Sequence, residues 1–159
     1  ILPIVKVLSA LFVHAFFVVF ALIICSFNGY TPTLHTLQIF YYTGCTFVFV
    51  LALVYATSAI VAFFRDLTQI INIILQVGVW MTPIMWDLNM LSGHPLLMKA
   101  FKLNPMYYIV SGYRDSILGK TWLTEHWKWG IYFWVVTIII FIFGSGIFKR
   151  LKLHFADVL

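Results

Sequence analysis

The chain has 159 residues, of which 63% are hydrophobic and only 9% are charged, and its mean hydropathy is +1.01. A soluble domain carries about 25% charged residues, so this composition excludes a soluble globular protein and predicts an integral membrane protein. The net charge of +5 does not indicate nucleic-acid binding, because the basic residues are scattered or lie beside predicted membrane spans, where membrane topology explains them.

The first predicted span covers residues 7–27, and the chain before it contains no methionine. It also lacks the basic start and the small-residue cleavage site of a signal peptide. We therefore interpret the chain as part of a longer protein. His14, within this span, is more typical of a neutral hydrogen bond between helices than of a proton relay, although both readings stay open.

The second predicted span covers residues 39–64, after a turn-rich loop at 28–38 that has no Lys, Arg, Asp or Glu. Small residues along this span, such as Gly44 and Ala56, favour close helix packing. Cys25 and Cys45 lie within hydrophobic runs. We interpret them as small buried apolar residues, because their spacing supports neither a disulfide nor a metal site.

The third predicted span covers residues 67–86 and has a polar face. Gln69, Asn72 and Gln76 follow Arg65 at spacings of four, three and four residues, which places them on one side of a helix. Because an unpaired amide costs several kcal/mol in hydrocarbon, we expect this amide stripe to face other protein or a water-filled path. Pro83 cannot donate to the helix and is expected to end it.

Arg65 and Asp66 form a charged pair at the tight turn before this span. One interpretation is a local salt bridge that anchors the helix end among lipid headgroups. The other is a contact with a partner or with a gate of the path. The sequence does not separate the two.

Residues 88–118 are too apolar for a plain loop and are predicted to form two short helices. Asn104 and Pro105 are a turn signal followed by a helix start, with Asn104 as the cap. The helix at 105–118 is too short to cross a bilayer. We favour a re-entrant pair that enters the membrane and returns, with helices lying flat at the interface as the alternative.

The last predicted span covers residues 129–148 and is expected to stop at a basic cluster at 149–152. Four full spans place Lys6, Arg65 and this cluster on one side of the membrane. Basic residues near short connections favour the cytoplasm, so we expect both ends of the chain inside and the segment 87–128 outside. The fold class predicted is therefore all-α and integral to the membrane, as one transmembrane domain over residues 1–159.

The sequence lacks the usual signatures of catalysis and of metal binding. It contains no GxxxxGK[ST] loop, no GxSxG elbow, no HExxH and no CxxC. The carboxylates predicted to lie outside, Asp87, Asp115 and Glu125, form no clear set for metal or base chemistry. We therefore expect no catalytic residue, no metal and no cofactor in this chain.

Four motifs in order carry a family resemblance: Arg65 with Asp66, the run Thr82-Pro83-Ile84, Asn104 with Pro105, and the run 112–115. With these motifs the whole chain resembles the membrane subunit of type-2 ABC exporters. It is most similar to the polysaccharide branch, which holds the teichoic-acid translocation permease and its O-antigen and capsule relatives. The resemblance implies the C-terminal part of a six-span permease, without the N-terminal helix and the first two spans.

The resemblance also implies partners and a mechanism. Two permeases pair with two copies of an ATPase subunit, which binds ATP and Mg, and together they move a polyprenyl-diphosphate-linked polymer outward through the plasma membrane. Wall teichoic acid is the expected cargo, and O-antigen or capsule glycan is the alternative. The residues expected to line the path or its gate are Gln69, Asn72, Gln76, Trp80, Pro83, Trp86, Tyr107, Tyr113 and Arg114.

Two roles within that set follow from side-chain chemistry. Aromatic residues such as Trp80 and Tyr107 suit stacking on sugar rings, or an interface belt. Arg114 and lysines of the outer segment suit phosphate groups, because guanidinium offers a bidentate fork. A drug or lipid exporter of the same superfamily is a second hypothesis, and a membrane-embedded transferase or scaffold is a third.

Overall fold

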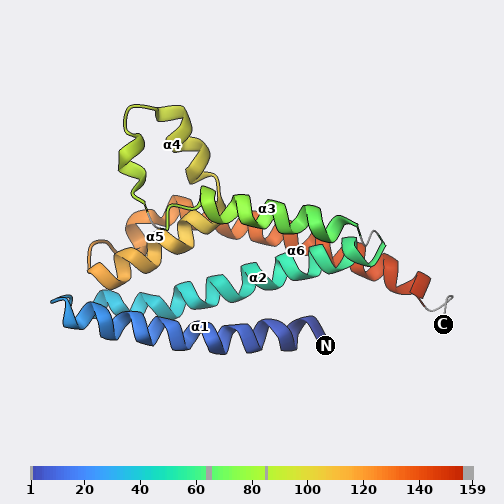
Figure 1. The fold of residues 1–159 in the computed structure, drawn as a ribbon, viewed down its shortest axis with the longest axis horizontal. Helices are drawn as coiled ribbons and strands as arrows, with labels where there is room; N and C mark the ends of the chain where they lie inside the picture. Colours follow the sequence, from blue (N-terminus) through green and yellow to red (C-terminus); the bar gives the residue numbers. More distant parts are fainter. Residues whose placement is uncertain (1, 64–65, 85, 156–159) are drawn as a thin grey trace.

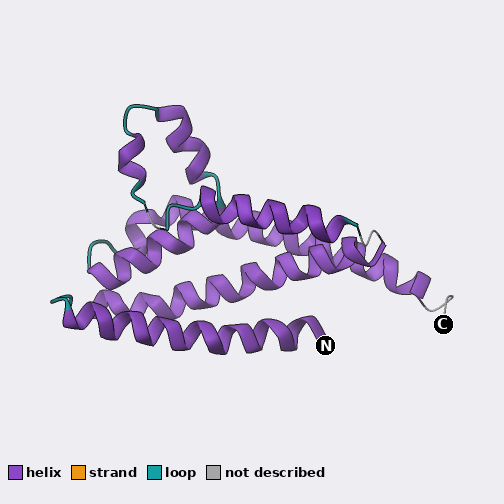
Figure 2. Ribbon diagram, viewed as in Figure 1, coloured by secondary structure: helices purple, strands orange, loops and turns teal. Residues whose placement is uncertain are grey.

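The computed structural model describes residues 2–63, 66–84 and 86–155, and these residues form helices joined by short loops, with no strand among them (Figure 2). The all-helical prediction is confirmed. The six α-helices are α1 (Leu2–Phe27), α2 (Gln38–Phe63), α3 (Leu67–Met81), α4 (Pro95–Lys102), α5 (Pro105–Leu118) and α6 (Trp127–Phe155). Three 3-10 helices lie between them: η1 (Leu34–Leu37), η2 (Leu88–Leu91) and η3 (Leu123–His126).

Three stretches of the described chain are long and apolar enough to cross a membrane: Ile4–Phe27, Leu34–Ser58 and Leu123–Ile147. They lie in α1, in η1 with α2, and in η3 with α6, and correspond to the predicted spans at 7–27, 39–64 and 129–148. Helix α6 continues to Phe155, past the basic cluster at 149–152 that was expected to stop it. Lysine and arginine favour helix, so a basic cluster ends the apolar part of a helix rather than the helix itself.

The third predicted span is shorter than expected, and this corrects the count of four full spans. Helix α3 ends at Met81 after 15 residues, which is about 22 Å of rise. The hydrocarbon core of a bilayer is about 30 Å thick, so α3 by itself does not cross it. The reason is local, because Pro83 cannot continue the helix and the chain turns away before Trp86.

The long helices lie side by side with their ends at two levels (Figure 1). The connections at 28–37 and 119–126 lie at the left end of Figure 1, and we call this the loop end. The start of α1, the end of α2, the start of α3 and the end of α6 lie towards the other end, which we call the terminal end. Lys6, near the start of α1, and the basic cluster at 149–152, near the end of α6, therefore lie towards the terminal end, and Arg65 lies outside the described residues.

The predicted short helices in segment 88–118 are present as α4 and α5. Helix α5 starts where α3 ends and runs to the loop end, packed against α2 and α6 (Figure 1). Helix α4 and η2 stand out from the side of the bundle, and among the helices α4 contacts mainly α5 and η2. Tyr132 of α6 donates a hydrogen bond of 2.7 Å to the carbonyl of Leu103, which fixes the turn between α4 and α5.

The packed core lies between α2, α5 and α6 and consists largely of aromatic rings. Phe133 of α6 is fully buried, and its ring lies 5.3 Å from that of Tyr108 and 5.8 Å from that of Phe49. Towards the terminal end, α2 and α6 approach so closely that a Cβ added at Gly144 would lie 2.6 Å from the backbone nitrogen of Ala56. Small residues on both helices therefore permit the contact.

One side chain ties the loop end together. Gln38, at the start of α2, donates from Nε2 to the carbonyl of Thr121 at 3.2 Å and accepts from the backbone of Leu123 at 2.6 Å. The two loops also meet through the rings of His35 and Trp122, whose centroids are 4.4 Å apart. These contacts set the position of the chain between α5 and α6.

Candidate functional site

The site is built around the point where α3 stops. The backbone nitrogen and the Oγ1 of Thr82 both bond to the carbonyl of Gly78, at 3.1 and 2.8 Å, and close the last turn of the helix. Thr82 and Pro83 are both buried. The polar backbone at Thr82 and Pro83 thus lies inside the protein, where its carbonyl groups need partners.

Arg114 supplies those partners. Its Nη2 donates hydrogen bonds to the carbonyl oxygens of Pro83 at 2.8 Å and Ile84 at 3.2 Å. Hydrogen bonds from a charged donor are stronger than neutral ones, so this guanidinium holds the broken backbone against α5. The predicted contact of Arg114 with phosphate stays a prediction, and one of its nitrogens is occupied in this structure.

The side chain of Asn104 connects the end of α3 with the start of α5. Its Oδ1 accepts from the backbone of Met106 at 3.0 Å, which is the predicted capping bond of α5. Its Nδ2 donates to Oγ1 of Thr82 at 3.0 Å. Pro105 follows at the first position of the helix, as predicted. One side chain therefore starts α5 and fixes the end of α3 beside it.

A cavity lies at the loop end between α5, the projecting η2 and α4, and the chain at 120–126. Its volume is about 290 Å³. A smaller cavity of about 60 Å³ adjoins it and shares Lys102, Tyr107, Ser111 and His126 with it. We call the two together the loop-end pocket. The larger part is also lined by Asp87, Leu88, Asn89, Met98, Arg114, Asp115, Lys120 and Thr121, and the smaller part by Tyr42, Tyr108, Gly112 and Trp129.

The pocket contains both carboxylates and cations. Asp87 accepts a hydrogen bond from the backbone of Asn89 at 3.0 Å, and this bond lowers the pKa of its carboxyl group. Asp115 accepts from Thr121 Oγ1 at 2.8 Å, and its Oδ2 lies 3.8 Å from Nε2 of His126. Each carboxylate therefore already has a partner in the protein.

Tyr113, a predicted path residue, does not line this pocket. Its hydroxyl lies 2.9 Å from Nε2 of His14 and 2.7 Å from Oγ1 of Thr43, so it bonds to α1 and α2. This contact agrees with the interpretation of His14 as a hydrogen bonder between helices. Tyr107, by contrast, lines both parts of the pocket. The structure thus separates two tyrosines that the sequence had grouped.

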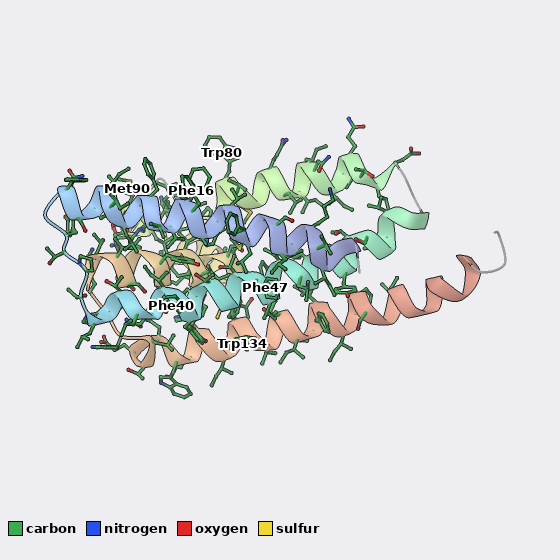
Figure 3. All side chains as sticks on the ribbon, turned by 90° about the horizontal axis from the view of Figure 1, so that it is seen from below. Phe16, Phe40, Phe47, Trp80, Met90 and Trp134 are labelled. Carbon is green, nitrogen blue, oxygen red and sulfur yellow. The ribbon has the colours of Figure 1, made fainter. Side chains whose placement is uncertain are left out.

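The amide stripe lies on the outside of this chain. Gln69, Asn72 and Gln76 are all exposed, and none of them has a hydrogen-bond partner within the described residues. Trp80 is 82% exposed and points away from the bundle (Figure 3). The stripe therefore has no partner in the described part of this chain, and its predicted role in a path or an interface stays a prediction.

The remaining predicted residues lie apart from the pocket. Trp86 packs its ring against Phe101 of α4, with centroids 5.2 Å apart. Asp66 is exposed just before α3 and makes no side-chain capping bond. Arg65 lies outside the described residues, so the predicted pairing of these two stays a prediction.

Sequence reasoning missed the pocket residues Lys102, Ser111 and His126. A signal was present in α5, where Tyr107, Ser111 and Arg114 follow at spacings of four and three and so share one face. The contribution of Lys102 was not readable, because it depends on how α4 folds back over α5.

Comparison with known proteins adds a family. The family model described as ABC-2 type transporter matches residues 2–118. The match covers α1 to α5 and includes the break after α3 and most of the residues that line the loop-end pocket. No curated protein and no solved structure gives a match.

Proposed function

The chain belongs to the ABC-2 type transporter family, and from that premise we propose that it helps to export a lipid-linked cell-wall polymer, with wall teichoic acid as the leading cargo. Family membership makes it a membrane permease component of an ABC exporter, whose ATPase is a partner in the transporter. In the proposal that ATPase is a separate subunit that binds ATP and Mg, and a second permease copy completes the complex.

The observation that carries the proposal is the polar break in the third apolar segment. Helix α3 presents exposed amides, stops after 15 residues and is followed by buried polar backbone held by Arg114 and Asn104. Non-helical backbone at membrane depth is tolerated where protein or a water-filled cavity covers it. A polar cargo needs such a route through an apolar protein, and an inert anchor does not.

The alternative cargo, O-antigen or capsule glycan, fits the same features, because every lipid-linked glycan offers sugar rings and phosphate. A lipid or drug exporter is a second candidate. One observation favours it, a largely apolar cavity of about 180 Å³ between α1 and α2, lined by Val7, Phe47 and Val50 among others. An apolar cargo would use that cavity rather than the loop-end pocket.

Native mass spectrometry of the full-length protein, released gently from its own membrane, tests the assembly. We expect two permeases with two ATPase subunits. ATP hydrolysis by that complex is then expected to increase with lipid-linked glycans and not with apolar drugs. A permease that is recovered without any ATPase would contradict the proposal, and stimulation by drugs alone would favour the second candidate.

The proposed orientation puts the terminal end in the cytoplasm. Thr36, in η1 at the loop end, provides a test, because a cysteine at Thr36 (Thr36→Cys) is expected to react with an impermeant thiol reagent added to intact cells. A cysteine at Asp66 (Asp66→Cys), at the terminal end, is the matched control and is expected to react only after permeabilisation. The reverse pattern would invert the orientation.

A further inference from the structure

We propose that the loop-end pocket binds a phosphorylated sugar, with Lys102 at the phosphate and the tyrosine-rich part of the pocket against the sugar ring. The inference rests on the proposed export function, since it assigns the pocket to one unit of the departing polymer. It differs from the sequence-based expectation in the cation it selects, because that expectation assigned the phosphate to Arg114 and to unspecified lysines.

The charged groups that line the pocket differ in whether they already have partners in the protein. Arg114 is held by two backbone carbonyls, Asp87 caps η2, and Asp115 is bonded to Thr121. Lys102 and Lys120, in contrast, make no hydrogen bond and no ion pair to any residue that the structure describes. The groups left for a ligand are therefore cationic.

Lys102 differs from Lys120 in its position. Lys102 lies at the end of α4 and lines both parts of the pocket, and its side chain is partly buried. Lys120 lines only the larger part and is exposed. A partly buried cation attracts an anion more strongly than one in bulk water, because the effective dielectric constant is lower. Lys102 is therefore the assigned phosphate ligand.

Two hydroxyl groups that can form hydrogen bonds to a ligand line the pocket with Lys102. Tyr107 and Ser111 lie one turn apart on α5 and line both parts of the pocket. Neither hydroxyl has a hydrogen-bond partner within the described ranges. A phosphate ester with neighbouring sugar hydroxyls accepts from and donates to such groups. These residues form no network of their own that a ligand would have to break.

Aromatic rings form one wall of the smaller part of the pocket. The half-buried ring of Trp129 lines the smaller part of the pocket together with the buried rings of Tyr42 and Tyr108, and the Tyr42 ring packs on Gly112 of α5. Aromatic rings offer flat apolar faces, and the carbon face of a sugar ring packs on such a surface. The larger cavity, at about 290 Å³, is at the lower end of the range for small-molecule sites, about 300–1,000 Å³. A charged group next to an aromatic wall fits a sugar phosphate better than free phosphate.

Binding of glucose 1-phosphate to the full-length permease with its ATPase, in nanodiscs of neutral lipid, tests the inference. We expect saturable binding, and we expect Lys102→Met to weaken it about tenfold or more, because a charge-assisted bond is lost. Lys99→Met is the matched control. It removes the same charge from the same helix at an exposed residue outside the pocket, and wild-type binding is expected.

Several outcomes would overturn the inference. Equal losses of binding in Lys102→Met and Lys99→Met would show that the loss of one positive charge, and not the position of Lys102, weakens binding. Inorganic phosphate that binds as well as glucose 1-phosphate would remove the sugar from the assignment. Competition by phosphatidylglycerol added to the nanodiscs, with no effect of glucose on its own, would identify a lipid headgroup as the occupant. Equal thermal stability of all variants is the required control for folding.

ATP-driven export by the same proteins, reconstituted in sealed vesicles, separates this inference from the proposed function. Export by wild-type protein without any glucose 1-phosphate binding would contradict the pocket assignment and leave the exporter in place. An absence of ATP-driven glycan export from a folded permease–ATPase complex would contradict the proposed function, whatever the pocket binds. Loss of both binding and export in Lys102→Met, with Lys99→Met unaffected, is the result expected.

Discussion

The packed part of the molecule and helix α3 differ in whether their polar side chains have hydrogen-bond partners within the described chain. In the core between α2, α5 and α6, several polar groups have partners in the same chain: Trp134 donates to the hydroxyl of Tyr41 at 2.9 Å, and Tyr113 bonds to Thr43. On α3 the amides of the stripe face outward and no residue of α3 is buried. In a membrane both arrangements must satisfy the same groups, so we expect water or another protein to complete α3.

A substitution at Gly144 is expected to have the largest effect on the packed part of the molecule. A Cβ there would approach the backbone of Ala56, which has no rotamer to move out of the way. We expect Gly144→Ala to destabilise the protein by about 3 kcal/mol, at the upper end of overpacking costs. Thermal unfolding in detergent measures it. Gly146→Ala is the control, because nothing lies within 4 Å of its added Cβ.

Gly112 lies at a second close contact in the packed part, and a change at Tyr42 can compensate for its substitution. Its added Cβ would overlap the ring of Tyr42, and this contact brings α5 against α2. We expect Gly112→Ala to cost about 1–3 kcal/mol, somewhat less than the backbone clash, since a side chain can shift.

The double variant Gly112→Ala with Tyr42→Leu is expected to recover part of that stability, because the smaller side chain leaves room. Gly44→Ala, with open space at its Cβ, is expected to be neutral or slightly stabilising in a helix. A stable Gly112→Ala protein would show that α5 is not packed against α2 as the structure has it.

Asn104 tests the junction between the two regions. Asn104→Ala removes the cap of α5 and the bond to Thr82, and we expect a loss of about 1–2 kcal/mol. Asn104→Asp keeps the capping oxygen but cannot donate to Thr82, so a smaller loss is expected. Unfolding measurements on the three proteins rank the bonds. Equal stability of Asn104→Ala and wild type would show that neither bond contributes.

The smallest effect on stability is expected for the amide stripe, where function and packing separate. Gln76→Leu changes an exposed residue, so the free energy of unfolding of the single chain is expected to stay within about 0.5 kcal/mol of wild type. Export is expected to fall several-fold, because a path or interface loses a polar group. Full export with stronger self-association would show that the stripe is a packing surface between copies.

The sequence predicted the elements well and their contacts poorly. Period and apolar length located α1, α2 and α6, and the Asn104–Pro105 signal located the start of α5, since these features depend on local backbone chemistry. The end of α3 was placed several residues too late, at 86. Pro83 excludes the residue before it from the helical conformation, and Thr82 is extended, with φ −88° and ψ 124°.

The site was harder to predict because its residues come together only through tertiary contacts. Tyr107 and Arg114 both line the pocket, but the sequence does not show that Arg114 is bound by the carbonyls of Pro83 and Ile84. Likewise, Lys102 looks like any exposed lysine of a short helix until α4 is placed beside α5. Amide and charge patterns indicate which residues need partners, and the fold decides which ones already have them.

The bond from Tyr132 to Leu103 has a mechanical consequence. Helix α6 is 29 residues long, a stiff rod of about 43 Å, and Tyr132 attaches its start to the turn between α4 and α5. A shift of α6 along its axis would therefore also move the turn beside Lys102, together with Trp129, which lines the pocket from α6 itself. Movement of α6 is in this way linked to the shape of the pocket.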